Sequence, residues 1–171
     1  MIAAKNILQQ RPGCAGFTLI ELMVVVAVIC ILAMLAIPSN LVHYQRQDVA
    51  EALKMTDKML VDISYYYVIN QSFPANNKEA GLPEPEFLIG NKVTRVDIED
   101  GVVHITLGNK ANKSLAGKIL SLHPAVVIDS PTSPISWLCG KEEPVTGMEV
   151  VGVDKTDVAR VTIPKSCGTY K

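Results

Sequence analysis

One acidic side chain, Glu21, interrupts a long apolar stretch near the start of this sequence of 171 residues. From Phe17 to Ile37, Glu21 carries the single formal charge. A carboxylate in hydrocarbon costs about 2.5–3.5 kcal/mol or more, which normally implies a cationic partner and a function. Cleavage between Gly16 and Phe17 would create such a partner, because an α-amino group has a pKa of about 7.7–8.0 and is largely protonated at neutral pH. That amine would lie one helical turn from Glu21, or could meet Glu21 of a neighbouring copy.

The apolar stretch predicts a membrane-spanning helix. At about 1.5 Å per residue, Phe17 to Ile37 would extend roughly 32 Å, close to the hydrocarbon thickness of a bilayer. Residues 1–16 carry Lys5 and Arg11 and have no apolar core, which predicts a positive leader on the cytoplasmic side. We therefore expect residues 1–16 to be a processing segment that plays no part in the fold.

The run Gly16-Phe17-Thr18-Leu19-Ile20-Glu21 resembles the cleavage and methylation motif of type IV pilins and related pseudopilins. The similarity combines a basic leader, a small residue before the cut, Phe after it, Glu in the next turn and a following apolar run. It implies that a prepilin peptidase cleaves after Gly16 and methylates the amine of Phe17. It also implies that Glu21 pairs with the amino terminus of a neighbouring subunit during filament assembly.

Two other processing signals are alternatives to this motif. A secretory signal peptide needs a small-residue cleavage site after its apolar segment, and Leu35-Ala36-Ile37-Pro38 is a poor one. A lipoprotein signal at Cys14 needs an apolar segment before the cysteine, where the sequence has the polar run Gln9-Gln10-Arg11-Pro12-Gly13. Because the sequence lacks what each of these two signals requires, the pilin-type motif is the favoured interpretation.

Beyond the apolar stretch, the sequence predicts that the helix continues with one face suited to a core. Residues on this face recur at intervals typical of a helix, whereas charged residues take other faces. The face comprises Val42, Val49, Leu53, Thr56, Leu60, Ile63 and Tyr67. Pro38 predicts a kink or a locally melted turn, because it lacks an N–H group, and it matches a proline that pilins have in this region. The helix is expected to end at about Tyr67–Ser72, before Phe73-Pro74.

The remaining sequence predicts an antiparallel sheet of about four strands. The alternation over residues 92–107, with a hairpin signal at Asp100-Gly101, predicts the first two strands and places His104 on a solvent-facing side. Further strands are expected at residues 118–122 and 135–139, with shorter extended pieces at residues 148–153 and 158–163. The expected fold class is α+β, with a long N-terminal helix, in part membrane-spanning and in part amphipathic, packed on this sheet.

Three segments follow from these expectations: a leader at residues 1–16, a transmembrane and filament-core helix at residues 17–39, and a globular head at residues 40–171.

If the helix crosses a bacterial inner membrane, the head reaches an oxidising compartment where disulfides persist. We predict a Cys139–Cys167 bond, worth roughly 3–4 kcal/mol in the loop-entropy model, that bounds a C-terminal loop. Cys30 is expected to be free within the apolar helix. His104 and His123 are isolated, so no zinc site or other cofactor is expected.

Charge and motifs argue against two other classes of function. Removing Lys5 and Arg11 with the leader lowers the formal net charge from −1 to −3, so net charge does not suggest nucleic-acid binding. The loop of residues 140–166 also sums to −1, which does not resemble a phosphate-binding stripe. No nucleophile–base set, nucleophile elbow or dinucleotide-binding loop stands out, so an enzyme is not expected.

The resemblance implies a structural subunit that waits in the inner membrane and is then polymerised into an extracellular pilus. Its partners would be other pilin subunits, the prepilin peptidase and the inner-membrane assembly machinery. The alternatives are a pseudopilin of a type II secretion system, which would usually lack the cysteine pair, and a DNA-binding competence pilin. Gly16, Phe17, Glu21, Pro38, Cys139 and Cys167 are the residues on which this interpretation depends.

Overall fold

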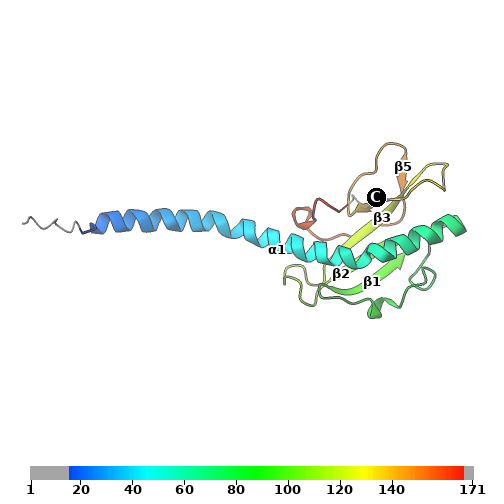
Figure 1. Cartoon of the computed structure of the whole chain (residues 1–171), viewed down its shortest axis with the longest axis horizontal. Coiled ribbons are helices and arrows are strands. Elements are labelled where there is room, and N and C mark those ends of the chain that lie inside the picture. Colours follow the sequence, from blue (N-terminus) through cyan, green and yellow to red (C-terminus); the bar gives the residue numbers. More distant parts are fainter. Residues whose placement is uncertain (1–15, 168–171) are drawn as a thin grey trace, which may run out of the picture. The chain divides into compact units, whose positions relative to one another are not determined.

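The computed structural model describes residues 16–167, except for the side chains of residues 35–40. The chain contains two compact units, one ending at Pro38 and one beginning at Ser39. Helix α1 (Leu19–Asn70) contributes to both units (Figure 1). Among the residues described with their side chains, no helix combines the length and the hydropathy of a membrane span. The leader lies outside the described residues, and the span over residues 17–37 falls partly outside the described side chains, so both stay predictions. Helix α1 is unbroken through Pro38, so the expected alternative of a locally melted turn is wrong there, whereas the kink stays a prediction.

Within the second unit, α1 packs one face into the hydrophobic core, as the helical spacing predicts. Val49, Leu53 and Ile63 are fully buried together with Thr56, whose hydroxyl donates to the carbonyl of Leu53 at 2.8 Å. The helix ends at Asn70, inside the predicted range. The next residue has a positive φ, and its backbone N–H bonds the carbonyl of Tyr67, which is the geometry of a left-handed helix cap.

The sheet of the head consists of strands β1 (Val93–Glu99), β2 (Val102–Leu107), β3 (Ile119–Val127), β4 (Ser136–Cys139) and β5 (Met148–Val150). The sheet is antiparallel throughout, with strand order β1-β2-β3-β4, and β5 pairs with β3. The α+β fold with a long helix and an antiparallel sheet is confirmed. The expected extended piece at residues 158–163 is wrong, because a 3-10 turn occupies Arg160–Thr162.

The turn between β1 and β2 is the one that the sequence predicts. Asp100 and Gly101 both have a positive φ, of 49° and 82°, as the central residues of a type I′ hairpin require. Glycine is needed here for a second reason, since a Cβ at position 101 would lie 2.6 Å from the ring of Phe73. The turn therefore both sets the strand register and closes on the loop that follows α1.

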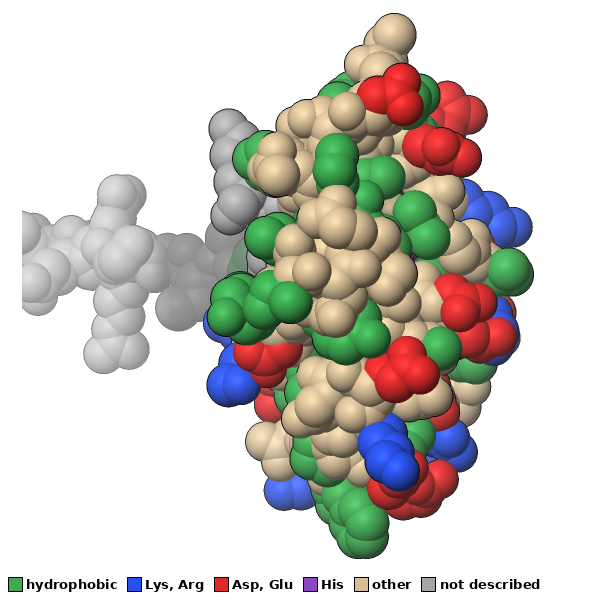
Figure 2. Space-filling model, turned by 90° about the vertical axis from the view of Figure 1, so that its right-hand side faces the viewer, with side chains coloured by type: hydrophobic (Ala, Val, Ile, Leu, Met, Phe, Trp, Pro, Cys, Tyr) green, Lys and Arg blue, Asp and Glu red, His purple; other side chains and the backbone are tan. Residues whose placement is uncertain are grey.

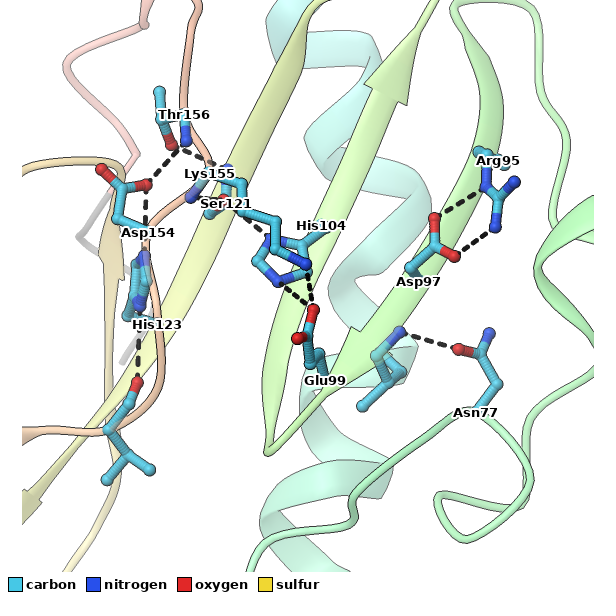
Figure 3. Close-up of polar contacts among 12 residues, drawn as sticks. Asn77, Arg95, Asp97, Glu99, His104, Ser121, His123, Asp154, Lys155 and Thr156 are labelled. Carbon is cyan, nitrogen blue, oxygen red and sulfur yellow. Dashed lines mark hydrogen bonds and ion pairs between the residues drawn. The ribbon is translucent and has the colours of Figure 1, made fainter.

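Strand β1 departs from simple alternation at a bulge between Val93 and Arg95. The bulge adds one residue to this strand, so Val93 and Val96 are both buried although three positions separate them. Loop residue Asn77 then fixes the outer edge of β1. Its buried amide accepts the N–H of Ile98 at 2.7 Å and donates to the carbonyl of Val96 at 3.0 Å (Figure 3).

Strand β3 continues through Pro124, where the sequence predicts that the strand ends. Residues up to Leu122 pair with β2, and residues from Ala125 onward pair with β5. Pro124 lies between these two stretches, so its missing N–H deprives neither strand of a hydrogen bond. Its carbonyl accepts the N–H of Val151 at 3.0 Å. The proline marks a change of partner strand and leaves β3 unbroken.

The prediction that His104 faces solvent is wrong, because its side chain is only 4% exposed. Figure 3 shows His104 and Ser121 in front of the strands, with α1 behind them. The face of the sheet opposite α1 is covered by the segment after β5, which bonds to it through Lys155 and Thr156. Strand alternation predicts one buried face of the sheet, which is the face that packs on α1. The opposite face is buried as well, because the segment after β5 covers it.

Candidate functional site

The first turn of α1 holds Glu21 in a capping box with Thr18. Glu21 Oε2 accepts hydrogen bonds from the backbone N–H of Thr18 at 2.9 Å and from its hydroxyl at 2.8 Å, and Glu21 N–H donates back to Thr18 Oγ1 at 3.3 Å. This reciprocal arrangement satisfies donors that a helix start leaves unpaired. The pattern Thr18-x-x-Glu21 was available in the sequence as a capping signal, in addition to the isolated charge. Glu21 therefore starts the helix as well as carrying its charge.

The side chains that follow Glu21 form a continuous apolar surface. Every side chain from Phe17 to Met34 is exposed in the single chain, and nearly all of them are apolar. Apolar surface of this extent marks contact with lipid or with another protein. Cys30 lies in this surface as an exposed free thiol. The segment thus offers a helical contact surface with one carboxylate at its start.

In the head, Cys139 and Cys167 form the predicted disulfide, with Cα atoms 5.8 Å apart. It joins the end of β4 to the chain beyond the 3-10 turn at Arg160–Thr162, and both cysteines are buried. The bond therefore closes residues 140–166 into a loop that rests on the sheet. We call these residues the disulfide loop.

A set of polar groups fastens the disulfide loop to the sheet (Figure 3). Buried Ser121 in β3 donates its N–H to Thr156 Oγ1 at 3.0 Å, and its Oγ accepts the N–H of Lys155 at 3.0 Å. The same Oγ lies 2.8 Å from Nδ1 of His104. The Lys155 amine also pairs with Glu99, at the end of β1. Ser121 is thus the point at which the loop and two strands meet.

A second contact of the same kind joins His123 to Asp154. His123 is 2% exposed, and its two ring nitrogens face the carbonyl of Val151 at 3.4 Å and Asp154 Oδ1 at 3.3 Å (Figure 3). Asp154 Oδ1 also accepts the N–H of Thr156 at 2.9 Å. The two histidines that are isolated in the sequence are therefore neighbours on one buried face, where they hold the disulfide loop.

Three pKa values in this network are displaced. Burial lowers the pKa of His104, and the positive charge of Lys155 lowers it further, against a smaller opposing effect of Glu99. Burial raises the pKa of Asp154, but hydrogen bonds from Thr156 and from His123 outweigh it and lower the pKa overall. The hydrogen bond and charge of Lys155 lower the pKa of Glu99. Within the described residues, no group of three or more His, Cys, Asp or Glu is placed to hold a metal ion.

We expect the head to lose stability as the pH falls from about 7 to 5, because the unfolded chain protonates His104 near its ordinary pKa of about 6.5 before the folded chain does. His104→Gln should make this dependence shallower in the detergent-solubilised protein, measured by chemical denaturation across the pH range. His43→Gln, on the exposed surface of α1, is the matched control and should keep the wild-type dependence. A wild-type dependence in His104→Gln would contradict the prediction. Folding also lowers the pKa of Asp154 and of Glu99, so protonation of these two carboxylates destabilises the head, but at a more acidic pH than protonation of His104 does.

Comparison with known proteins covers both the apolar segment and the head. Residues 46–168 match the family described as Pilin (bacterial filament), and residues 11–37 match the prokaryotic N-terminal methylation motif. The chain is 34% identical over 160 residues to the type IV major pilin protein PilE1 of Neisseria gonorrhoeae, covering 89% of this chain and 86% of that protein.

Two fimbrial proteins are similar over shorter regions. The chain is 33% identical to a fimbrial protein of Neisseria meningitidis serogroup A, over 74% of this chain and 72% of that protein. It is 34% identical to the fimbrial protein EcpC of Eikenella corrodens, over 72% of this chain and 80% of that protein. Together with the helix, the antiparallel sheet and the disulfide, these matches show that this chain belongs to the type IV pilin family.

Proposed function

We propose that this subunit is made as an inner-membrane precursor, cleaved after Gly16, methylated on the amine of Phe17 and polymerised through residues 17–38. Its family is one of structural pilus subunits, and two relatives that match most of its length are type IV major pilin proteins. The prepilin peptidase, the inner-membrane assembly machinery and further copies of the chain are its proposed partners. The proposed role is structural, without catalysis.

The exposed apolar surface from Phe17 to Met34 is the observation that carries this proposal. Lipid tails and the side chains of a neighbouring helix are similarly apolar, so a helix of this kind exchanges one environment for the other at little cost. Apolar packing alone leaves the register between helices weakly specified. A single carboxylate near the start of the helix supplies that register when it meets one amine.

The geometry of Glu21 suits such a pairing. Its Oε2 takes both hydrogen bonds from Thr18, and a carboxylate has acceptor sites on both of its oxygens. We assign Oε1 to the protonated amine of Phe17 in a neighbouring subunit. The capping box then holds the carboxylate in place before the neighbour arrives, which reduces the entropy lost on pairing.

The mature chain is expected to begin at N-methylated Phe17. Intact-mass analysis of the filament subunit should show the loss of residues 1–16 and the gain of one methyl group. Gly16→Leu should leave the precursor uncut in the membrane, because the peptidase requires a small residue before the cut, whereas Gly13→Leu in the same leader should still be processed. A mature start beyond residue 38 would overturn the proposal.

The two alternative functions have less support. Type II pseudopilins usually lack a terminal cysteine pair, whereas Cys139 and Cys167 are bonded here. A competence pilin that binds DNA along its surface would need an extended basic stripe. The face of the head drawn in Figure 2 instead intersperses acidic and basic side chains with apolar ones.

A further inference from the structure

A cavity of about 690 Å³ lies beside the disulfide of the head. The bonded cysteines, Val158, Ile163 and Pro164 give it an apolar wall. Its charged lining residues are Arg46, Lys141, Arg160 and Lys165 against Glu142 and Asp157. The volume is within the range of about 300–1,000 Å³ that is typical of small-molecule sites.

Both carboxylates of the lining are engaged by donors of the protein. Asp157 Oδ1 accepts the N–H of Ile119 at 2.6 Å, and its Oδ2 lies 3.2 Å from Lys118 Nζ. Glu142 Oε2 accepts the N–H of Cys139 at 3.4 Å. Neither carboxylate forms an ion pair with a cation of the cavity in the described part of the chain. Lys118, which does not line the cavity, therefore partly offsets the negative charge of Asp157.

The cations of the lining keep donors free. Arg46 uses Nε to donate to the carbonyl of Val161 at 2.7 Å, which leaves its terminal nitrogens. Within residues 16–167, the side chains of Lys141, Arg160 and Lys165 have no hydrogen bond or ion pair. All four cations are exposed to solvent. The cavity thus collects unpaired positive charge above an apolar wall.

The formal charges of the disulfide loop sum to −1 in the sequence, but the acidic and the basic side chains of the loop lie in different places. Asp154 faces buried His123 instead of the cavity, and Glu143 and Glu149 do not line it. The four cationic lining residues come from α1 and the disulfide loop together. A sum over the loop therefore conceals a local excess of positive charge, which only the fold brings together.

We propose that this cavity binds a small anionic ligand, a sugar-sized molecule that bears a phosphate or sulfate ester. The guanidinium groups of Arg46 and Arg160 present paired N–H donors that match phosphate and sulfate oxygens. Lys141 and Lys165 add point charges, and the ligand's ring packs on the apolar wall. The inference depends on the head alone and is independent of how the subunit polymerises.

The test measures binding to the detergent-solubilised subunit by calorimetry, with a sulfated heparin-type disaccharide, its unsulfated counterpart, glucose 6-phosphate and inorganic phosphate as probes. The sulfated disaccharide and glucose 6-phosphate should bind, and the unsulfated disaccharide should not. The double variant Arg160→Ala and Lys165→Ala should weaken binding by about tenfold or more, since each charged hydrogen bond contributes about 1.5–3 kcal/mol. The matched control, Lys78→Ala with Lys113→Ala, removes the same charge outside the cavity and should bind as the wild type does.

Four results would overturn the proposal. Equal weakening in the control would mean that net charge alone attracts the probe, and binding of the unsulfated disaccharide would remove the need for an anion. If inorganic phosphate bound as tightly as glucose 6-phosphate, the sugar ring would contribute nothing to binding, and the proposed contact between the ring and the apolar wall would be ruled out. Binding of duplex DNA without binding of either small ester would indicate an extended nucleic-acid surface. Near-ultraviolet circular dichroism and mapping of the Cys139–Cys167 bond establish that the variants are folded.

Discussion

Glu21→Ala is expected to abolish or sharply reduce filaments while leaving membrane insertion and cleavage after Gly16 intact. In a plain anchor the carboxylate is only a cost, and its removal should leave insertion unchanged or improve it by up to about 2–3 kcal/mol. In a pilus subunit the same change removes the partner of an incoming amine. Filament yield by shearing and electron microscopy, set against precursor processing by immunoblot, measures the two effects separately.

Two matched variants separate the pairing role of Glu21 from its capping role. Glu21→Gln keeps an oxygen for the hydrogen bonds from Thr18 but loses the charge, so it should also lose filaments. Thr18→Ala removes the hydroxyl of the capping box, at a helix cost of about 0.5–2 kcal/mol, and keeps the charge. This variant should still assemble. Filament loss in Thr18→Ala together with normal yield in Glu21→Gln would assign the effect to the cap.

Co-expression tests whether the pairing is between subunits. Wild-type chains should recruit Glu21→Ala chains partially into shared filaments, because each subunit contributes an amine to one neighbour and a carboxylate to another. The fraction of mutant chains can be read by mass spectrometry of sheared filaments. A normal filament yield from Glu21→Ala alone would defeat the mechanism.

Replacing Cys139 and Cys167 by Ser should lower the stability of the head by roughly 3–4 kcal/mol in the loop-entropy model. The main loosening should occur in the disulfide loop near residues 158–166. Residues 154–157 should stay attached longer, because Ser121, His123 and Ile119 continue to bond them. Denaturant unfolding gives the total change, and hydrogen exchange mapped by peptide shows where the loop opens.

Cys30→Ser is the control for this variant, since it removes an exposed thiol outside the head. Its unfolding midpoint should match that of the wild-type head. Peptide mapping without reduction should find the Cys139–Cys167 link in both the wild type and Cys30→Ser. Finding both late cysteines as free thiols in secreted protein, or equal protection of residues 158–166 without the bond, would contradict the prediction.

Features that depend on neighbouring residues could be predicted from the sequence. The end of α1 follows from Phe73-Pro74, and the β1–β2 turn follows from Asp100-Gly101, because each depends on local backbone sterics. The buried positions Val49, Leu53 and Ile63 follow from helical spacing. In each case the physical cause lies within a few residues of the position concerned.

Features that depend on contacts with segments distant in the sequence could not be predicted. The alternation of apolar and polar residues in β2 gives His104 an exposed position. It is buried because a segment about fifty residues later covers that face of the sheet. Pro124 looks like a strand end, and it lies within a strand because β2 and β5 share one edge of β3. The bulge in β1 similarly reverses the alternation at Val93.

The sequence by itself determined the family, the apolar helix with its one carboxylate, the hairpin and the cysteine pair, because motif, spacing and composition are local properties of the chain. The tertiary structure decided which charges are free and which are engaged. It turned Asp154 toward His123 and brought Arg46 to the wall of a cavity with Arg160 and Lys165. Electrostatic and hydrogen-bond energies depend on distance in space, and that distance between remote residues exists only once the disulfide loop has packed on the sheet.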